Sequence, residues 1–321
     1  MDIFAFIALF GGLALFLYGV SLMGGSLERA ALGRMRETLG HLAGTPLRGV
    51  VLGACVTAAV QSSSAATVMT AGLVGAGAVT LRQAVGVVMG ANIGTTVTAH
   101  LLRLEGTGEG FLFRIFSPSA LAPLSVFAGT VLLLAAKKTR LKTAGQFILG
   151  FGILFTGMLQ MEAAVAPLRQ SPAFLRLIRT ADDPLLGVLA GAGVTAVIQS
   201  SSASVGILQA VSSTGAVSWS AAVPILLGQN IGTCVTPILA GIGGNRGARQ
   251  TALVHLLLNL LGTAVFLVLI YGARRHFHWT FWEKAVDKGG IAWFHTFFNL
   301  AVAAMFLPFA GALEKAVRRL A

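Results

Sequence analysis

The sequence predicts an all-α integral membrane protein built from two repeats, and three observations support this fold class. First, 55% of the 321 residues are hydrophobic and 11% are charged, whereas soluble domains carry about 25% charged residues. Second, several charge-free runs are long enough to cross a bilayer, which takes about 20 apolar residues. Third, the chain repeats itself at a constant offset that aligns residue 46 with residue 184. This composition excludes a soluble globular enzyme, a disordered chain and a fibrous repeat.

Seven segments are apolar enough to be predicted as membrane-crossing helices. They are 3–23, 83–102, 115–136, 143–161, one span within 184–245, 250–273 and 289–313. A separate run, 49–81, has 33 residues without a charge, and one straight helix of that length would extend about 50 Å. The hydrocarbon core is about 30 Å thick. Because a Gln-Ser-Ser-Ser cluster lies in the middle of this run, we predict two half-length helices that turn there, a re-entrant hairpin.

The hairpin sequence occurs twice. Between residues 46–98 and 184–236, 26 of 53 ungapped positions are identical, which shared membrane composition alone would not give. We therefore predict three parts: a first transport repeat over 1–140 with its hairpin at 46–81, a second repeat over 141–273 with its hairpin at 184–219, and a C-terminal helical segment over 274–321 that adds a membrane helix. Each repeat has three crossings and a hairpin that does not cross. Three is odd, so the two repeats should have inverted topology, as in many secondary transporters.

Basic residues predict the orientation in a cell (inner) membrane. Alternating the seven crossings places 14 Lys and Arg residues on the face that holds 25–48, 137–142 and the C-terminus, against nine on the other face. The positive-inside rule then puts the C-terminus in the cytoplasm and the N-terminus outside. This arrangement also accounts for the net charge of +12, so we expect lipid rather than nucleic acid as the partner. A homo-oligomer is left open.

The two Gln-Ser-Ser-Ser clusters are the candidate substrate site. Three hydroxyls and a carboxamide at mid-membrane depth are costly unless they bind something. A hairpin turn also exposes the free N–H groups of a helix start, which favour an anion. Two such tips that face each other would enclose a small tetrahedral oxyanion such as phosphate. The predicted substrate-binding residues are Gln61, Ser62, Ser63, Ser64, Gln199, Ser200, Ser201 and Ser202.

No Lys or Arg lies within 49–81 or 184–219, so a cation should accompany an anionic substrate. Sodium fits because it takes hydroxyl, carboxamide and carbonyl oxygens. A second duplicated motif, Asn-Ile-Gly-Thr, supplies such groups, and we predict sodium ligands at Asn92, Thr95, Thr98, Asn230, Thr233 and Thr236. The glycines around both motifs, Gly90, Gly94, Gly228 and Gly232, permit local unwinding that would free carbonyls for a cation.

These residues carry a resemblance to a known family. The segments QSSSA…GANIGTTVT and QSSSA…GQNIGTCVT resemble the paired signatures of the sodium-dependent phosphate cotransporter family, which includes the animal type II carriers and bacterial relatives. The pairs His255…Asn259 and His295…Asn299 also fit its pattern. The resemblance covers nearly the whole chain. It implies sodium-coupled phosphate symport by alternating access, with both ions held between the two tips, and it adds Gln229 to the sodium-binding residues. It implies no cofactor, and sodium as the only metal.

Other functions remain open at this point. A transporter of the same fold could carry another oxyanion, since sulfate and arsenate are also tetrahedral, or could export phosphate. A passive channel would ignore a sodium gradient. An intramembrane serine hydrolase would need a nucleophile with a base within reach, and the sequence has no Gly-x-Ser-x-Gly elbow. His255 and His295 are candidate proton carriers, although helix packing is the favoured interpretation.

Overall fold

The structure is a computed structural model that describes residues 3–42, 45–103, 118–167, 172, 178, 180–242, 245–277 and 279–320. Over these residues the chain is almost entirely helical, with one isolated antiparallel bridge between Ser218 and Ala285. Six of the described helical segments are long and apolar enough to cross a membrane. They are Ile3–Met23, Leu81–Leu102, Thr139–Val165, Trp219–Ile242, Arg246–His276 and Lys288–Leu320. The prediction of an all-α, multi-pass membrane protein is confirmed.

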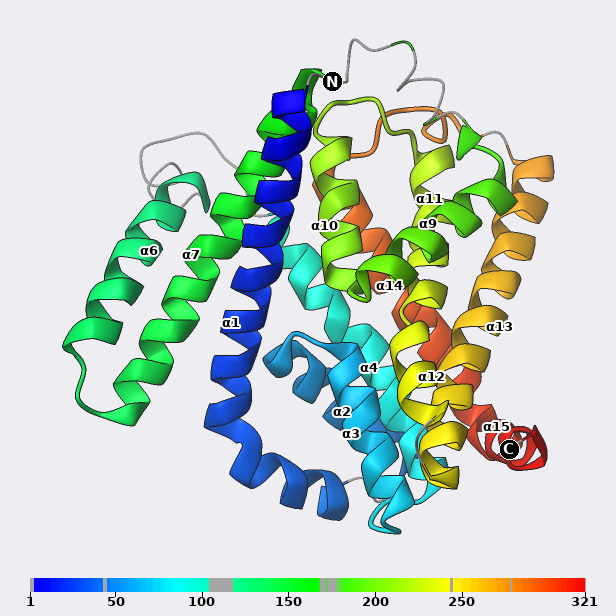
Figure 1. Cartoon of the computed structure of the whole chain (residues 1–321). Helices are drawn as coiled ribbons and strands as arrows, with labels where there is room; N and C mark the ends of the chain where they lie inside the picture. The colour runs from blue at the N-terminus through cyan, green and yellow to red at the C-terminus, as the bar shows by residue number, and fades with distance from the viewer. Residues whose placement is uncertain are drawn as a thin grey trace.

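The helices of the first half of the chain are α1 (Ile3–Leu42), α2 (Pro46–Val60), α3 (Ser63–Gly75), α4 (Leu81–Leu102), α6 (Pro118–Ala135) and α7 (Thr139–Val165). Among them, α1 lies between the α6–α7 pair on one side and the group of α2, α3 and α4 on the other (Figure 1). Helix α7 packs between α1 and α6. A Cβ at Gly19 would overlap the backbone of Leu154, so small residues let α1 and α7 approach closely. The expected span 115–136 corresponds to α6, and residues 115–117 lie outside the described residues.

The second half carries the elements that repeat α2 to α4. Its helices are α9 (Pro184–Ile198), α10 (Ser201–Ser212), α11 (Trp219–Gly232), α12 (Val235–Ile242), α13 (Arg246–His276), α14 (Lys288–Phe306) and α15 (Ala310–Leu320), with a 3₁₀ turn at Leu307–Phe309 between the last two. Helix α9 begins and ends at the positions that the repeat aligns with the ends of α2, and α10 begins at the position aligned with the start of α3. The duplication read from the sequence is therefore repeated in the helix boundaries.

Both breaks fall at the glutamine of the Gln-Ser-Ser-Ser cluster. Gln61 and Gln199 are left-handed, with φ of 59° and 57°, a region that non-glycine residues seldom occupy. The next residues, Ser62 and Ser200, cap α3 and α10 through their side chains. A glycine in the left-handed region then follows each pair at the turn toward the next helix, Gly77 with φ 72° and Gly215 with φ 70°.

Glycines hold each broken pair against the helix that follows it. A Cβ at Gly53 of α2 would collide with the Val87 carbonyl of α4, and a Cβ at Gly191 of α9 would collide with the Ile225 carbonyl of α11. Because glycine has no Cβ, it alone allows the two backbones to approach this closely. The same close backbone packing therefore places α2 against α4 and α9 against α11.

The helices that follow the two pairs differ. Helix α4 is continuous across Gly90 and Gly94, so the local unwinding that these glycines permit does not occur in this segment. Its counterpart breaks after Gly232, at Thr233 and Cys234, before α12 begins. Pro237 explains the break, because it has no N–H to donate to the Thr233 carbonyl four residues earlier and its ring crowds that carbonyl. The equivalent position in α4 is Ala99.

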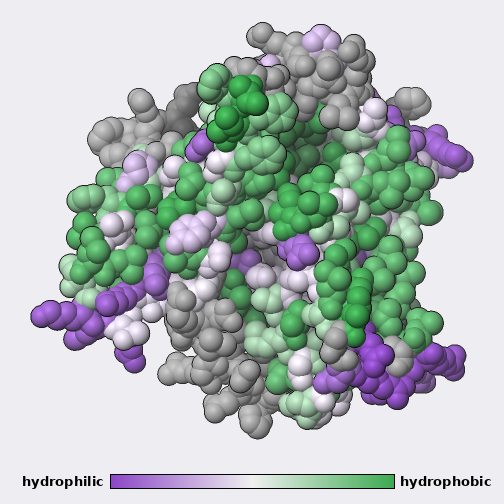
Figure 2. All heavy atoms as spheres, viewed as in Figure 1, coloured by the Kyte–Doolittle hydropathy of each residue, from purple (hydrophilic) through white to green (hydrophobic). Residues whose placement is uncertain are grey.

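The molecular surface suits a lipid environment. Apolar side chains cover much of the face in Figure 2, whereas the strongly hydrophilic ones gather mainly at its lower corners and upper right edge. Large hydrophobic residues project outward along several helices; Phe4 of α1 and Val268 of α13, both in membrane-crossing segments, are 76% and 73% exposed. Soluble proteins seldom expose contiguous apolar surface on this scale. This exposed apolar surface is therefore consistent with helices that cross a membrane.

Candidate functional site

The two Gln-Ser-Ser-Ser clusters, one from each repeat, line one cavity. Its volume is about 350 Å³, within the range of small-molecule sites. All eight predicted substrate-binding residues contribute to its lining, and helix α1 closes another side with Leu17, Val20, Ser21 and Gly25. The lining has no charged side chain among the described residues. The structure thus brings the two sequence-predicted tips to a single polar space.

Each tip presents the start of a helix. The first N–H groups of a helix have no acceptor within the helix. In each tip, the capping serine accepts a hydrogen bond from only one of them. Ser62 Oγ accepts from the Ala65 nitrogen at 3.1 Å, and Ser200 Oγ accepts from the Ala203 nitrogen at 3.2 Å. The backbone amides of the two intervening serines in each cluster donate to no acceptor among the described residues. Two helix N-termini, with their positive partial charge, therefore border the cavity.

The two glutamines have different surroundings despite their matched backbones. Gln61 is buried; its Nε2 donates to the Ala58 carbonyl at 2.5 Å, and its Oε1 accepts from Thr98 Oγ1 at 2.6 Å. Ser202 Oγ in turn donates to Thr98 Oγ1 at 3.5 Å. Thr98 of α4 therefore links the first tip to the second. Gln199 is exposed and makes no side-chain hydrogen bond with any described residue.

Of the predicted sodium-binding residues, Thr98 alone contacts cavity-lining residues through a hydrogen bond that the structure describes. None of the predicted sodium-binding residues, Thr98 included, lines the cavity. Thr95 and Thr233 donate to the carbonyls four residues earlier in their own helices, and Asn230 Nδ2 does the same. Asn92 bonds across to α13. Two buried oxygens of this set, Gln229 Oε1 and Thr236 Oγ1, have no partner among the described residues.

Two residues that the sequence analysis did not single out complete the polar surroundings of the second tip. Thr195 Oγ1 donates to Ser204 Oγ at 2.8 Å, and Gln229 Nε2 donates to the Ser204 carbonyl at 3.0 Å. All three side chains are buried. Thr195 could have been found from the repeat, since Thr57 occupies the equivalent position. Ser204 gave no such signal because its counterpart in the first repeat is Ala66.

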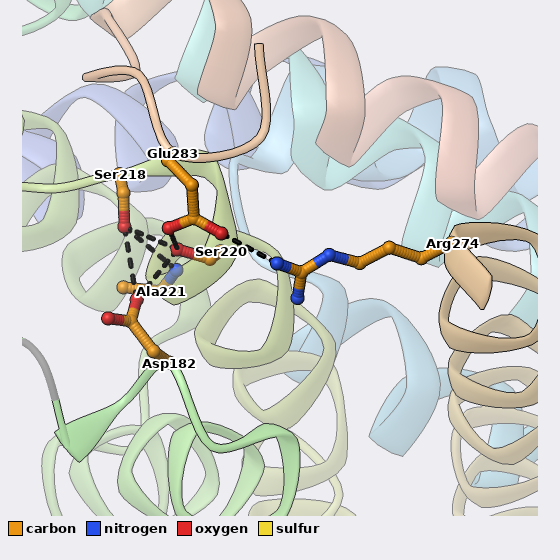
Figure 3. A network of polar contacts seen from close by, with 6 residues as sticks. All are labelled: Asp182, Ser218, Ser220, Ala221, Arg274 and Glu283. Carbon is orange, nitrogen blue, oxygen red and sulfur yellow. Dashed lines mark hydrogen bonds and ion pairs between the residues drawn. The ribbon is translucent and has the colours of Figure 1, made fainter. Parts of the chain in front are cut away.

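A further polar network lies at the outer end of the second repeat (Figure 3). Ser220 Oγ donates to Asp182 Oδ1 at 2.7 Å and lies 3.3 Å from Glu283 Oε2. Ser218 Oγ, the cap of α11, also bonds to Asp182. Arg274 at the end of α13 pairs with Glu283 at 2.6 Å. This network joins the start of α9, the start of α11 and the segment before α14.

Comparisons with known proteins identify the family. The family model described as Na+/Pi-cotransporter matches residues 15–163 and 168–287. The chain is 28% identical over 296 residues to "Uncharacterized protein YqeW" of Bacillus subtilis, covering 91% of each chain. It is 27% identical over 314 residues to "Putative inorganic phosphate export protein YjbB" of Salmonella typhimurium, covering 97% of this chain and 55% of that protein.

A shorter match reaches animal proteins. The chain is 42% identical over 69 residues to human "Sodium-dependent phosphate transport protein 2B", covering 22% of this chain and 10% of that protein. The chain spans about half the length of the YjbB relatives. No solved structure matches it. Since the family model covers most of the chain, this protein belongs to the Na+/Pi-cotransporter family, a family of transporters and not of enzymes.

Proposed function

We propose that this protein is a sodium-coupled transporter of inorganic phosphate, with phosphate held between the two Gln-Ser-Ser-Ser tips. The observation that carries the proposal is the shared cavity, because both clusters line it in full. Eight side chains with hydroxyl or carboxamide groups, together with the amides of two helix starts, offer donors from opposite sides. Such donors suit a small tetrahedral oxyanion. The family membership and the names of the relatives support phosphate as that anion.

Charge balance supports sodium as the coupling ion. The cavity lining has no Lys or Arg among the described residues, and two helix starts, each with a partial charge of about +0.5, fall short of the charge of a phosphate dianion. Oxygen groups behind the tips suit a hard monovalent cation. The proposed sodium ligands are the predicted set, Asn92, Thr95, Thr98, Gln229, Asn230, Thr233 and Thr236. Gln229 Oε1 and Thr236 Oγ1, which lack partners among the described residues, are the oxygens with most capacity to bind a cation.

Alternating access would follow from an inverted repeat. In Figure 1, α2 and α3 lie in the lower half of the view and α10 lies in the upper half, yet their tips line the same cavity. The two termini also lie toward opposite ends of the molecule. We therefore propose re-entrant hairpins that enter from opposite faces, an outside N-terminus and a cytoplasmic C-terminus in the inner membrane. Rocking of one repeat against the other would expose the cavity to each side in turn.

The test is uptake of radiolabelled phosphate by proteoliposomes that contain the purified protein. With sodium outside, phosphate should accumulate above equilibrium, and replacement of sodium by potassium or choline should abolish accumulation. The double variant Gln61→Ala/Gln199→Ala should lose uptake while it keeps the elution profile of a folded protein, with stability lowered only by the loss of the Gln61–Thr98 hydrogen bond. Full uptake by the double variant would refute the site. Equilibration without sodium would indicate a channel.

Export is the second candidate, because the chain is similar over 97% of its length to a protein named for phosphate export. The same proteoliposomes distinguish the two directions. Efflux of preloaded phosphate driven by an outward sodium gradient, combined with weak uptake under an inward gradient, would support an exporter. Competition by sulfate or arsenate in both assays would show how selective the cavity is for phosphate.

A further inference from the structure

A chain of buried polar side chains connects the two Asn-Ile-Gly-Thr segments through α13. Asn92 Nδ2 of α4 donates to Asn259 Oδ1 at 2.8 Å, and Asn259 Nδ2 donates to Cys234 Sγ at 3.1 Å. Cys234 Sγ then approaches the Asn230 carbonyl at 3.6 Å. His255, one turn before Asn259 on α13, lies 3.1 Å from Asn92 Oδ1 through its Nε2. These side chains are all buried.

The hydrogen-bonding roles in this chain are fixed by chemistry. A carboxamide oxygen only accepts, so His255 Nε2 carries the proton and donates to Asn92. Asn92 is therefore held at both ends, its nitrogen by Asn259 and its oxygen by His255. A carboxamide oxygen has two lone pairs, and His255 occupies one of them. The second lone pair of Asn92 Oδ1 remains for another partner, and Asn92 keeps 7% exposure.

The same chain reaches the break between α11 and α12. Asn259 touches Cys234, which is one of the two residues of the break, and Pro237 leaves the Thr233 carbonyl there without its helical donor. Asn230 Nδ2 donates to the Leu226 carbonyl, and Asn230 Oδ1 accepts no hydrogen bond from any described residue. His255 and Asn259 on α13 thus connect segments of both repeats whose oxygens can accept a further partner.

A second pair of the same residue types lacks these contacts. His295 and Asn299 have the same spacing on α14 and are equally buried. Asn299 Nδ2 donates to the His295 carbonyl of its own helix, whereas Asn299 Oδ1 and His295 Nδ1 have no partner among the described residues. The described contacts of this pair therefore stay within one helix. The His-x-x-x-Asn spacing alone does not create the bridge.

We propose that His255 and Asn259 are positioning residues for sodium, which orient the Asn92 carboxamide and hold the α11–α12 break beside it. The two Asn-Ile-Gly-Thr segments then present one shared set of oxygen ligands. This inference rests on the proposed sodium coupling. Residues that hydrogen-bond a metal ligand from behind typically account for a factor of about 10 to 100 in metal affinity, and His255 and Asn259 stand in this relation to Asn92.

The experiment measures sodium and phosphate dependence separately in proteoliposomes. His255→Ala and Asn259→Ala should each raise the apparent KM for sodium about 10-fold or more, with the KM for phosphate at saturating sodium nearly unchanged. His255→Gln should restore part of the sodium affinity, since its amide can donate to Asn92. The matched controls His295→Ala and Asn299→Ala should leave the sodium KM at the wild-type value. An equal shift in the controls, or no shift in the variants, would overturn the inference.

Cys234 provides a second measurement that does not need transport. The chain has two cysteines, and Cys55 is exposed whereas Cys234 is buried. In a Cys55→Ser background, sodium should slow alkylation of Cys234 by N-ethylmaleimide, and in His255→Gln this protection should require several-fold more sodium than in the parent. The same protection curve in both would contradict the positioning role. If sodium changes neither uptake nor labelling in the parent protein, the proposed function itself fails.

Discussion

Thr98 holds the carboxamide of Gln61, and the equivalent pair in the second repeat does not make this bond. Thr98 Oγ1 donates to Gln61 Oε1 at 2.6 Å. At the equivalent positions of the second repeat, Gln199 is exposed and Thr236 Oγ1 is buried without a partner among the described residues. The backbone angles of the two glutamines agree within a few degrees, so the difference lies in the side chains and in the helix that carries each threonine.

This asymmetry gives a first prediction, made with one substitution at two equivalent sites. Thr98→Val keeps the side-chain shape but leaves Gln61 Oε1 buried and unpaired, so we expect a loss of about 1–3 kcal/mol of stability. Thr236→Val removes an oxygen that has no partner to lose among the described residues, and its stability should equal or exceed that of the parent. Thermal unfolding in detergent measures both. Equal destabilisation by the two variants would show that the Thr98 contact contributes nothing.

The left-handed backbone of Gln199 allows the effect of its backbone conformation on stability to be separated from the role of its side chain in uptake. Glycine adopts the left-handed conformation of Gln199 without steric cost, so Gln199→Gly should fold with a stability within about 1 kcal/mol of the parent. A β-branched residue is a strong outlier there, and Gln199→Val should lose about 1–3 kcal/mol. If the side-chain carboxamide of Gln199 contacts phosphate, both variants lose uptake. Normal uptake by the stable Gln199→Gly would remove Gln199 from the phosphate site.

Two glycines on α9 provide a matched test of helix packing. A Cβ at Gly191 would collide with the Ile225 carbonyl, whereas a Cβ at Gly193 would have no neighbour within 4 Å. Gly191→Ala must push α9 away from α11, and such overpacking costs about 1–3 kcal/mol. Gly193→Ala should instead stabilise the helix by up to about 1 kcal/mol. Thermal unfolding of the two variants should therefore shift in opposite directions, and a shared direction would contradict this packing.

The duplicated features were those that sequence could predict. A break was expected in the middle of each overlong apolar run, and both breaks fall on Gln61 and Gln199, because caps and left-handed turns are local properties of a few residues. The matching helix starts in the two repeats follow for the same reason. The cavity was predicted in outline, since paired polar breaks in apolar runs need a common partner to offset their cost.

Contacts between distant segments were beyond the sequence. Nothing local indicates that Asn92 meets Asn259, 167 residues away, because such pairings depend on how the helices pack. Glycines permit local unwinding in both repeats, and a break occurs in one, at Thr233. The glycines are shared by both segments, whereas Pro237, which has Ala99 as its counterpart, is present only in the second, and the break follows the proline.

The polar network drawn in Figure 3 gives the last prediction, because its members differ in burial. The side chains of Arg274 and Glu283 are 40% and 65% exposed, and exposed ion pairs are worth about 0–1 kcal/mol. Arg274→Ala should therefore lower stability by less than about 1 kcal/mol, and added salt should reduce the difference further. Ser220 is 1% exposed and its hydroxyl faces two carboxylates.

Ser220→Ala should cost more than Arg274→Ala, because it removes a buried hydrogen bond to a charged acceptor and leaves Asp182 with one hydroxyl donor fewer. Such bonds contribute about 1.5–3 kcal/mol. Thermal unfolding at low and high salt separates the two effects: the Arg274→Ala deficit should shrink with salt and the Ser220→Ala deficit should persist. If Arg274→Ala is the more damaging variant at high salt, the exposed ion pair, and not the buried hydroxyl, is the main stabilising contact of this network.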